Sequence, residues 1–289
     1  MRRACIDIGS NTTRLLVAEC DGGELIEVHQ QRVFTRLGRS LRNDRRIDQD
    51  KIDELVGVVR EQLRTAGELG VADVTGVATA AIRSAANGAE LVAAIRRACG
   101  LTVRILSGDE EARLAFAGAA RTLGHVPAGE LGVVDVGGGS SELVVGTAPD
   151  RVRWCTSVAV GSGDLADSCL RSDPPSAAEL SHAREQIARS LDGLEVPNPT
   201  EAVAVGGSAT SLRQLAGPLL DADAFARSLK LLASRRASEI ANRFSLDLER
   251  VKLLPAGLLI LEAASELFGA ALTISRGGLR EGVLLEAAG

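Results

Sequence analysis

A strand–turn–strand pattern at residues 133–146, VVDVGGGSSELVVG, restricts the folds open to this chain. An apolar run that carries Asp135 breaks at three glycines and two serines, and a second apolar run follows Glu142. Glycines at 137–139 allow positive φ values and a close approach of the backbone to a ligand, and successive free N–H groups suit a phosphate oxygen. Asp135 and Glu142 are hard oxygen ligands of the kind that Mg²⁺ prefers. The pattern indicates a metal and phosphate site, and its alternative is an ordinary glycine hairpin with solvated acids.

A similar pattern occurs near the N-terminus, at residues 4–19, ACIDIGSNTTRLLVAE. Asp7 aligns with Asp135, and Gly9 aligns with Gly137, at a constant offset of 128 residues. Matched placement of an acid, a glycine, hydroxyls and an apolar triplet indicates an internal duplication. A third strand is predicted in each half, at 24–34 and 151–158. Each half therefore begins as a three-stranded meander, and the cleft between the halves would hold both turns.

Alternating helices and strands follow each meander, which predicts α/β layers with a mixed sheet in each half. In such folds ligands bind at the carboxyl ends of strands, where both glycine turns are expected. Helix starts are predicted at Asn87, as an N-cap, and at Ser107, which forms a capping-box pattern with Glu110. Pro255 predicts a kink or a break. The expected helices are 50–69, 87–98, 107–123, 176–191, 227–245, 248–268 and 279–287, and the expected strands are 74–78, 103–106, 203–207 and 271–274.

Length and composition narrow the class of protein. The 289 residues suffice for two domains, with a boundary expected near residues 126–130. A net charge of -5 and 2% aromatic residues argue against a nucleic-acid partner. Five widely spaced cysteines favour a reducing compartment. We find neither a signal-peptide pattern nor an apolar run long enough for a membrane span, so we expect a cytoplasmic protein without a membrane partner.

A series of motifs runs through the chain in a fixed order: DIGSNTTRLLVAE at 7–19, TRLG at 35–38, ATAAIRSAAN at 78–87, ILSGDEEARLAFAGA at 105–119, VVDVGGGSSEL at 133–143, GGSATSL at 206–212 and GGLREGVLLE at 277–286. Together they resemble the exopolyphosphatase and guanosine pentaphosphate phosphohydrolase family (Ppx/GppA), within the actin, Hsp70 and sugar-kinase group. The resemblance implies two duplicated ribonuclease H-like domains around an interdomain cleft. Domain I would span 1–125 and be completed by the C-terminal helix at 277–289, and domain II would span 126–276. Members of this family are often dimers, so a homodimer is expected by analogy.

The resemblance also implies roles for individual residues. Glu111 matches the proposed catalytic base, and a Mg²⁺ site would include Asp7, Asp135 and Glu142. The phosphate-binding set would be Ser10, Asn11, Thr12, Arg83, Gly137, Gly138, Gly139, Ser140, Gly207 and Ser208.

The residues alone leave other roles open for several of these side chains. Glu111 could stabilise its helix N-terminus alongside Glu110. Arg14 is interpreted as a structural ion-pair partner, and Arg280 and Glu281 could lie on an exposed face of the last helix.

The function that the resemblance implies is Mg²⁺-dependent hydrolysis. The substrate would be inorganic polyphosphate, losing its terminal phosphate, or guanosine pentaphosphate, losing its 5′ phosphate. Two alternatives are a kinase or ATPase of the same superfamily and a non-catalytic sensor that binds (p)ppGpp or polyphosphate. One segment departs from the family pattern: GSGDLAD at 161–167 has Asp164 and Asp167 where the family usually has an arginine and a glutamate.

Overall fold

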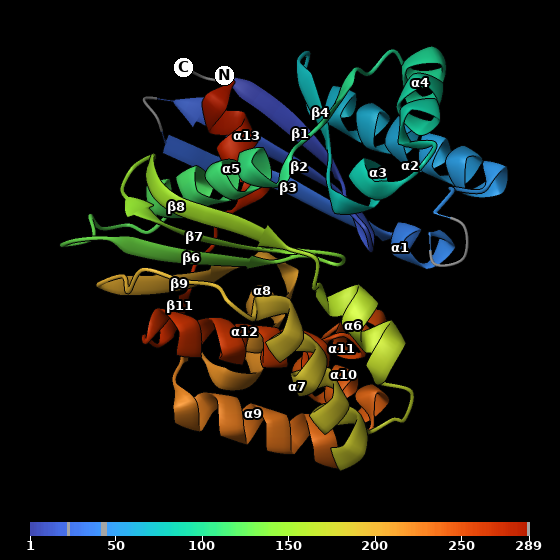
Figure 1. Cartoon of the computed structure of the whole chain (residues 1–289). Coiled ribbons are helices and arrows are strands. Elements are labelled where there is room, and N and C mark those ends of the chain that lie inside the picture. The colour runs from blue at the N-terminus through green and yellow to red at the C-terminus, as the bar shows by residue number, and fades with distance from the viewer. Residues whose placement is uncertain (22–23, 42–44, 288–289) are drawn as a thin grey trace.

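The computed structural model describes residues 1–21, 24–41 and 45–287, which form two β-sheets with helices packed around them (Figure 1). Part of the predicted loop at 40–50 and the last two residues of the segment 277–289 fall outside the described residues.

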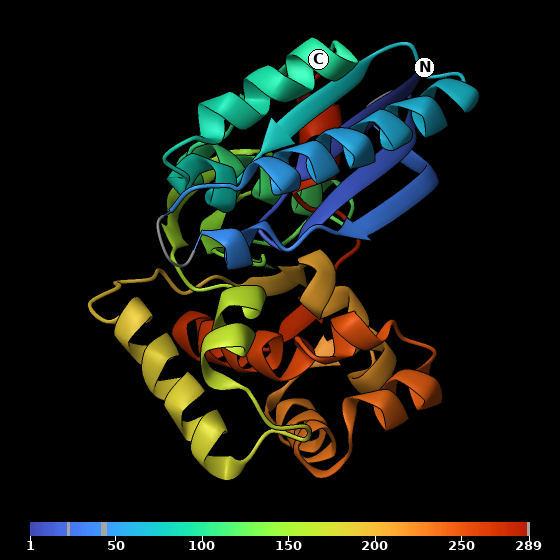
Figure 2. The ribbon, with the colours of Figure 1, turned by 90° about the vertical axis from the view of Figure 1, so that its right-hand side faces the viewer.

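The first sheet has five strands in the order β3-β2-β1-β4-β5. Strands β1, β2 and β3 pair antiparallel, as the predicted meander requires, whereas β1, β4 and β5 pair parallel. Helices α2 and α4 lie side by side over one face of this sheet (Figure 2). The elements are β1 (Arg2–Ile8), β2 (Thr12–Asp21), β3 (Glu24–Phe34), α1 (Leu37–Ser40), α2 (Gln49–Glu68), β4 (Val74–Ala78), α3 (Ala80–Ser84), α4 (Gly88–Cys99) and β5 (Val103–Ile105).

The second sheet has six strands in the order β10-β11-β9-β6-β7-β8. Read from β8 inwards, its pairing repeats that of the first sheet, with a short strand β10 added at the far edge. The strands are β6 (Leu131–Val136), β7 (Ser141–Thr147), β8 (Arg151–Val158), β9 (Glu201–Val205), β10 (Leu219–Leu220) and β11 (Leu272–Ile274). The duplication inferred from the two acid–glycine motifs is thus confirmed as a repeat of sheet topology.

Helices on the outer side of the second sheet pack around α12, most of whose residues are buried. The single helix predicted over 227–245 is two helices, because the chain becomes extended at Arg235 and Arg236. Pro255 marks a break, since it lies in the first turn of α12, where a missing N–H leaves no bond unmade. The elements are α6 (Ser162–Cys169), α7 (Ala177–Leu191), α8 (Gly206–Ala216), α9 (Ala222–Ser234), α10 (Ala237–Phe244), α11 (Leu248–Val251) and α12 (Leu254–Phe268). No helix in the described part of the chain combines the length and apolarity that a bilayer crossing requires.

Two helices, α5 (Gly108–Arg121) and α13 (Leu279–Glu286), lie between the sheets (Figure 1). Phe116 of α5 packs on the second sheet, and Val283 of α13 packs on the first. The two helix backbones touch, because a Cβ on Gly282 would lie 1.9 Å from the carbonyl oxygen of Leu114. The division expected between residues 125 and 126 falls in the connection from α5 to β6 and stays a prediction.

The two predicted helix starts have different outcomes. The capping box of Ser107 and Glu110 is confirmed, with each side chain accepting from the other residue's backbone N–H. Asn87 occupies the N-cap position of α4, but its side-chain amide pairs with the N–H and C=O of Ile47 instead of capping the helix. The amide of Asn87 therefore fastens α4 to the segment that precedes α2.

Candidate active site

A polar cavity between the two sheets is bordered by the turn after β1, the turn after β6 and the first residues of α8. It brings together most of the side chains predicted from the sequence: Asp7, Ser10, Asn11, Thr12, Glu111, Asp135, Gly137, Gly138, Gly139, Ser140, Glu142 and Gly207. Two predicted residues, Arg83 and Ser208, do not line it. The two duplicated turns therefore face one space, as the sequence repeat predicted.

The glycines of the second turn are needed because the two turns touch. A Cβ on Gly138 would lie 2.8 Å from the Cβ of Asn11, and one on Gly139 would lie 2.5 Å from the Oγ of Ser10. Gly137, Gly138 and Gly139 do not use the positive φ values that are open to them, whereas Gly206, at the start of α8, has φ +86°. A side chain on Gly138 or Gly139 would therefore push the two turns apart.

The duplicated strands present different charges at equivalent positions. Asp135 stands opposite Glu142 across β6 and β7, whereas Asp7 stands opposite Arg14 across β1 and β2. Residues directly opposite each other on antiparallel strands project to the same face. The interpretation of Arg14 as a structural ion-pair partner needs correction, because Arg14 lines the cavity.

Burial raises the pKa of the acids in this cavity. It raises the pKa of Glu142 well above the usual range, and the neighbouring Glu111 adds to that shift. The Oε1 of Glu142 accepts hydrogen bonds from the Oγ atoms of Ser140 and Ser157, at 2.7 and 2.8 Å. Burial also raises the pKa of Asp135 to about 6 and that of Asp7, in both cases against the opposing charge of Arg14. The acids are thus held where a cation would lower their pKa values again.

Glu111 lies in the first turn of α5, but Glu110 is the acid that completes the capping box with Ser107. The Oε2 of Glu111 accepts a hydrogen bond of 3.0 Å from Arg83, whose guanidinium also donates to the carbonyl oxygen of Leu106 at 2.7 Å. Burial raises the pKa of Glu111 to about 7, although the bond from Arg83 favours the carboxylate. Glu111 can therefore exchange a proton near neutral pH.

The two predicted residues outside the cavity have distinct surroundings. Arg83 lines a neighbouring cavity, which shares Ser10 and Ser140 with the first, and reaches the site through its bond to Glu111. Ser208 is fully buried in α8 against α12, where a Cβ on Gly257 would lie 2.5 Å from the Ser208 Oγ. The position of Ser208 is that of a packing residue between two helices.

Arginines form the part of the site that the sequence reasoning missed. Arg14, Arg250, Arg276 and Arg280 all line the cavity. The alternative that Arg280 lies on an exposed face of the last helix is wrong, because α13 lies between the sheets and leaves this residue 7% exposed. A signal for Arg280 was present, since the motif at 277–286 contains it, but a helical pattern alone cannot show which face is covered.

Arg250 is the most constrained of these arginines. Its Nε is buried without a hydrogen-bond partner among the described residues, and its guanidinium lies 5.7 Å from the ring centroid of Phe34. Burial and the neighbouring Arg14 lower the pKa of Arg250 to about 9. The pKa of Arg14 is lowered to about 10, chiefly by Arg280 and also by burial. Such a group of buried, mutually repelling cations suits a ligand with several negative charges.

The cavity fits a hydrated divalent cation better than a fully protein-ligated one. No group of three or more His, Cys, Asp or Glu side chains within the described ranges is arranged to hold a metal ion. Mg²⁺ commonly takes one or two carboxylates and fills its shell with water and phosphate oxygens. Asp7, whose Oδ1 is buried without a partner, and Asp135 are the acids that fit this role.

Comparison with known proteins gives consistent matches over the whole chain. The model of the Ppx/GppA phosphatase family matches residues 16–289. Exopolyphosphatase 2 of Mycobacterium tuberculosis is 30% identical over 100% of this chain and 99% of its own length. Exopolyphosphatase 1 of Mycobacterium leprae is 28% identical, over 99% of this chain and 89% of its own. The crystal structure of the Aquifex aeolicus member of the Ppx/GppA family superposes with a TM-score of 0.83 and 31% identity, covering 100% of this chain and 97% of that one.

Proposed function

This chain belongs to the Ppx/GppA phosphatase family, whose two-domain, actin-like fold it shares, and from that premise we propose that it is a Mg²⁺-dependent exopolyphosphatase. In this proposal it removes the terminal phosphate of inorganic polyphosphate, and guanosine pentaphosphate is a second substrate to be tested. The observation that carries the proposal is the placement of Glu111, a buried acid with a pKa of about 7, in the same cavity as both duplicated turns.

Glu111 is the general base in this proposal. It takes a proton from a water molecule, whose oxygen attacks the terminal phosphorus. The bond from that phosphorus to the bridging oxygen breaks, and the shortened chain leaves with the electron pair. Arg83 holds the Glu111 carboxylate in place at 3.0 Å. The bond from Arg83 also restrains the rise in the pKa of Glu111, so that the base form is available near neutral pH.

The remaining groups of the cavity bind and neutralise the substrate. Backbone N–H groups of the two turns and hydroxyls such as that of Ser10 take the phosphate oxygens. Arg14, Arg250 and Arg280 neutralise the negative charges, which compensates for their own burial. Mg²⁺ held by Asp7 and Asp135, which share the cavity with Glu142, would polarise the phosphate oxygens. The raised pKa values of these acids support a cation at this place.

The test is phosphate release by the purified protein with Mg²⁺, measured in parallel on short polyphosphate, long polyphosphate, guanosine pentaphosphate and ATP. We expect release from polyphosphate that stops on addition of EDTA. Glu111→Gln should lower turnover by about 10²–10⁴-fold, the usual contribution of a general base, while substrate binding is retained. The matched control is Glu110→Gln, at the adjacent residue, because a glutamine preserves the capping box of α5.

Three outcomes would contradict the proposal or part of it. Retained turnover in Glu111→Gln would remove Glu111 from the role of base. Turnover of ATP alone, with transfer to an acceptor, would identify a kinase or ATPase. Binding of polyphosphate without hydrolysis by the wild-type protein would identify a sensor.

A further inference from the structure

Two short helices are hydrogen-bonded to the backbones of the two turns, one helix to each turn. On the first-sheet side, the N–H of Arg36 donates to the carbonyl oxygen of Asn11 at 3.0 Å, and that of Gly38 donates to the carbonyl oxygen of Ser10 at 2.8 Å. These donors are at the start of α1. The position of α1 therefore fixes the turn after β1.

On the second-sheet side, α6 is bound to the other turn in the same way. The N–H of Ser162 donates to the carbonyl oxygen of Gly137 at 2.9 Å. The N–H groups of Gly163 and Asp164 donate to the carbonyl oxygen of Gly138 at 2.9 and 3.0 Å. Helix α6 begins within GSGDLAD, the segment that departs from the family pattern, so the departure lies directly against the glycine turn.

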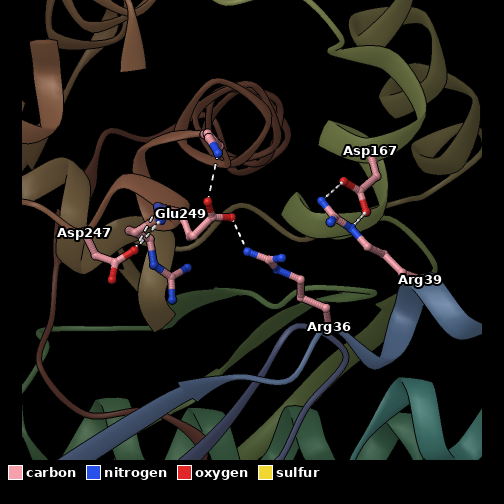
Figure 3. A network of polar contacts seen from close by, with 7 residues as sticks. Arg36, Arg39, Asp167, Asp247 and Glu249 are labelled. Carbon is pink, nitrogen blue, oxygen red and sulfur yellow. Dashed lines mark hydrogen bonds and ion pairs between the residues drawn. The ribbon is translucent and has the colours of Figure 1, made fainter. Parts of the chain in front are cut away.

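Ion pairs connect these elements across the cleft (Figure 3). Arg39 of α1 binds Asp167 of α6 through two parallel bonds, Nη2 to Oδ1 at 2.7 Å and Nε to Oδ2 at 2.8 Å. Beside it, Arg36 pairs with Glu249 of α11, which also accepts a bond of 2.8 Å from Lys252. We call the four residues Arg36, Arg39, Asp167 and Glu249 the clasp.

The helices that the clasp joins are already in close contact. A Cβ on Gly38 of α1 would lie 2.7 Å from the Oδ1 of Asp164 in α6. The third connected element, α11, carries Arg250 into the cavity, and the Asp247 side chain caps its first turn. The clasp thus connects three elements across the cleft. Helix α1 binds the turn after β1, α6 binds the turn after β6, and α11 carries the buried Arg250.

We propose that the clasp sets the spacing of the two phosphate turns, and that Arg39 and Asp167 are positioning residues for hydrolysis. The role in hydrolysis rests on the proposed function, whereas the effect on spacing does not. A phosphoryl group held by both turns reacts well only if both are correctly placed, and small misplacements cost large factors in rate. Neither residue lines the polar cavity, so both act through α1 and α6.

The bidentate pair permits a charge-swap test. The Arg39 side chain is 53% exposed and that of Asp167 is 18% exposed, so the pair lies outside the hydrophobic core and its variants should fold. The variants are Asp167→Asn, Arg39→Asp and the swap R39D/D167R. The control is Glu130→Gln, which breaks the ion pair of Arg153 and Glu130 at similar exposure, remote from α1 and α6.

Two measurements are made on each variant. Hydrogen exchange is followed by mass spectrometry in the segments 36–41 and 161–169, without substrate. We expect Asp167→Asn and Arg39→Asp to speed exchange in both segments by about 3- to 10-fold, the swap to restore protection, and the control to match wild type. On polyphosphate we expect kcat to fall by about 5-fold or more in the single variants, with a smaller change in KM, and to recover in the swap.

The two measurements separate this inference from the proposed function. If the wild-type protein hydrolyses none of the substrates, exchange alone decides whether the clasp fixes the turns. Wild-type exchange in Asp167→Asn would overturn the inference. So would a folded swap variant, with the thermal midpoint of wild type, that regains neither protection nor kcat.

Discussion

At the scale of single residues, opposing effects act on the pKa of Glu111. Its place in the first turn of α5 and its bond to Arg83 both favour the carboxylate. Burial and the nearby acids Asp7 and Asp135 favour the protonated form and prevail, raising the pKa to about 7. The acid is thus ionised over the upper half of the physiological pH range and protonated below it.

The pH dependence of turnover should follow this titration. Because the base form is required, kcat on polyphosphate should rise as the pH increases from about 5.5 and level off above about 8. The measurement is phosphate release at saturating substrate and Mg²⁺ across this range. The Glu110→Gln control should show the same rise, and a flat profile between pH 5.5 and 8 would remove Glu111 from the rate-limiting chemistry.

The free energy of unfolding should also depend on pH through Glu111. Folding raises the pKa of Glu111. The contribution of this carboxyl group to the free energy of unfolding is therefore full below its pKa in the unfolded chain, about 4.3, and is lost as the pH rises through about 7. Glu111→Gln carries no such charge. Without Mg²⁺, its free energy of unfolding should equal that of wild type near pH 4 and exceed it by on the order of 1–3 kcal/mol at pH 8. Denaturant unfolding at the two pH values tests this, and a variant less stable than wild type at pH 8 contradicts it.

Arg250 offers a test of the buried cations. Arg250→Met removes a buried cation that has an unpaired Nε, so we expect the ligand-free protein to gain on the order of 1 kcal/mol of stability. The same change should reduce the rise in thermal midpoint that tripolyphosphate causes in wild type. The matched control is Arg243→Met, because Arg243 also lies over an aromatic ring, that of Phe244, but is exposed. Wild-type stabilisation by tripolyphosphate in Arg250→Met would exclude this arginine from binding.

At the scale of elements, the contact of α5 with α13 decides where Glu111 and Arg280 lie. Gly282→Ala would place a Cβ 1.9 Å from the backbone oxygen of Leu114, so the helices must separate. We expect a loss of about 1–3 kcal/mol in unfolding free energy, together with lower turnover. The control is Gly57→Ala in α2, where a Cβ meets nothing within 4 Å and stability should rise by about 0.5–1 kcal/mol. Thermal unfolding of both variants tests the contrast, and a gain for Gly282→Ala would contradict it.

The sequence predicts an element well where that element depends on residues close to one another in the chain. The third strand of each half, the capping box at Ser107 and the strand at 74–78 lie where the sequence predicts them. The break at Arg235 within the expected helix 227–245 was missed, because its residues carry no glycine or proline signal. The side-chain role of Asn87 was missed because its partner, Ile47, is 40 residues away.

At the scale of the whole molecule, the duplicated sheet topology and the shared cavity could be predicted, since the repeat of acid and glycine is visible in the sequence. The burial of Arg280 could not, because it depends on α13 lying between two sheets that are distant in sequence. The contact between the turns could not be predicted from either motif alone, because it joins Gly138 of one motif to Asn11 of the other. Residue types indicated the chemistry, and long-range packing determined which of them face the cavity.

The unequal partners of the two duplicated acids have a further consequence. Asp7 faces Arg14, whereas Asp135 faces Glu142, so the two halves of the cleft differ in charge although their topology is the same. Linear polyphosphate reads the same from either end and carries no direction of its own. For such a substrate the protein alone determines in which direction the chain lies along the cleft. Because Asp7 faces an arginine and Asp135 faces a glutamate, the two sides of the cleft would bind the terminal phosphate and the following phosphates unequally.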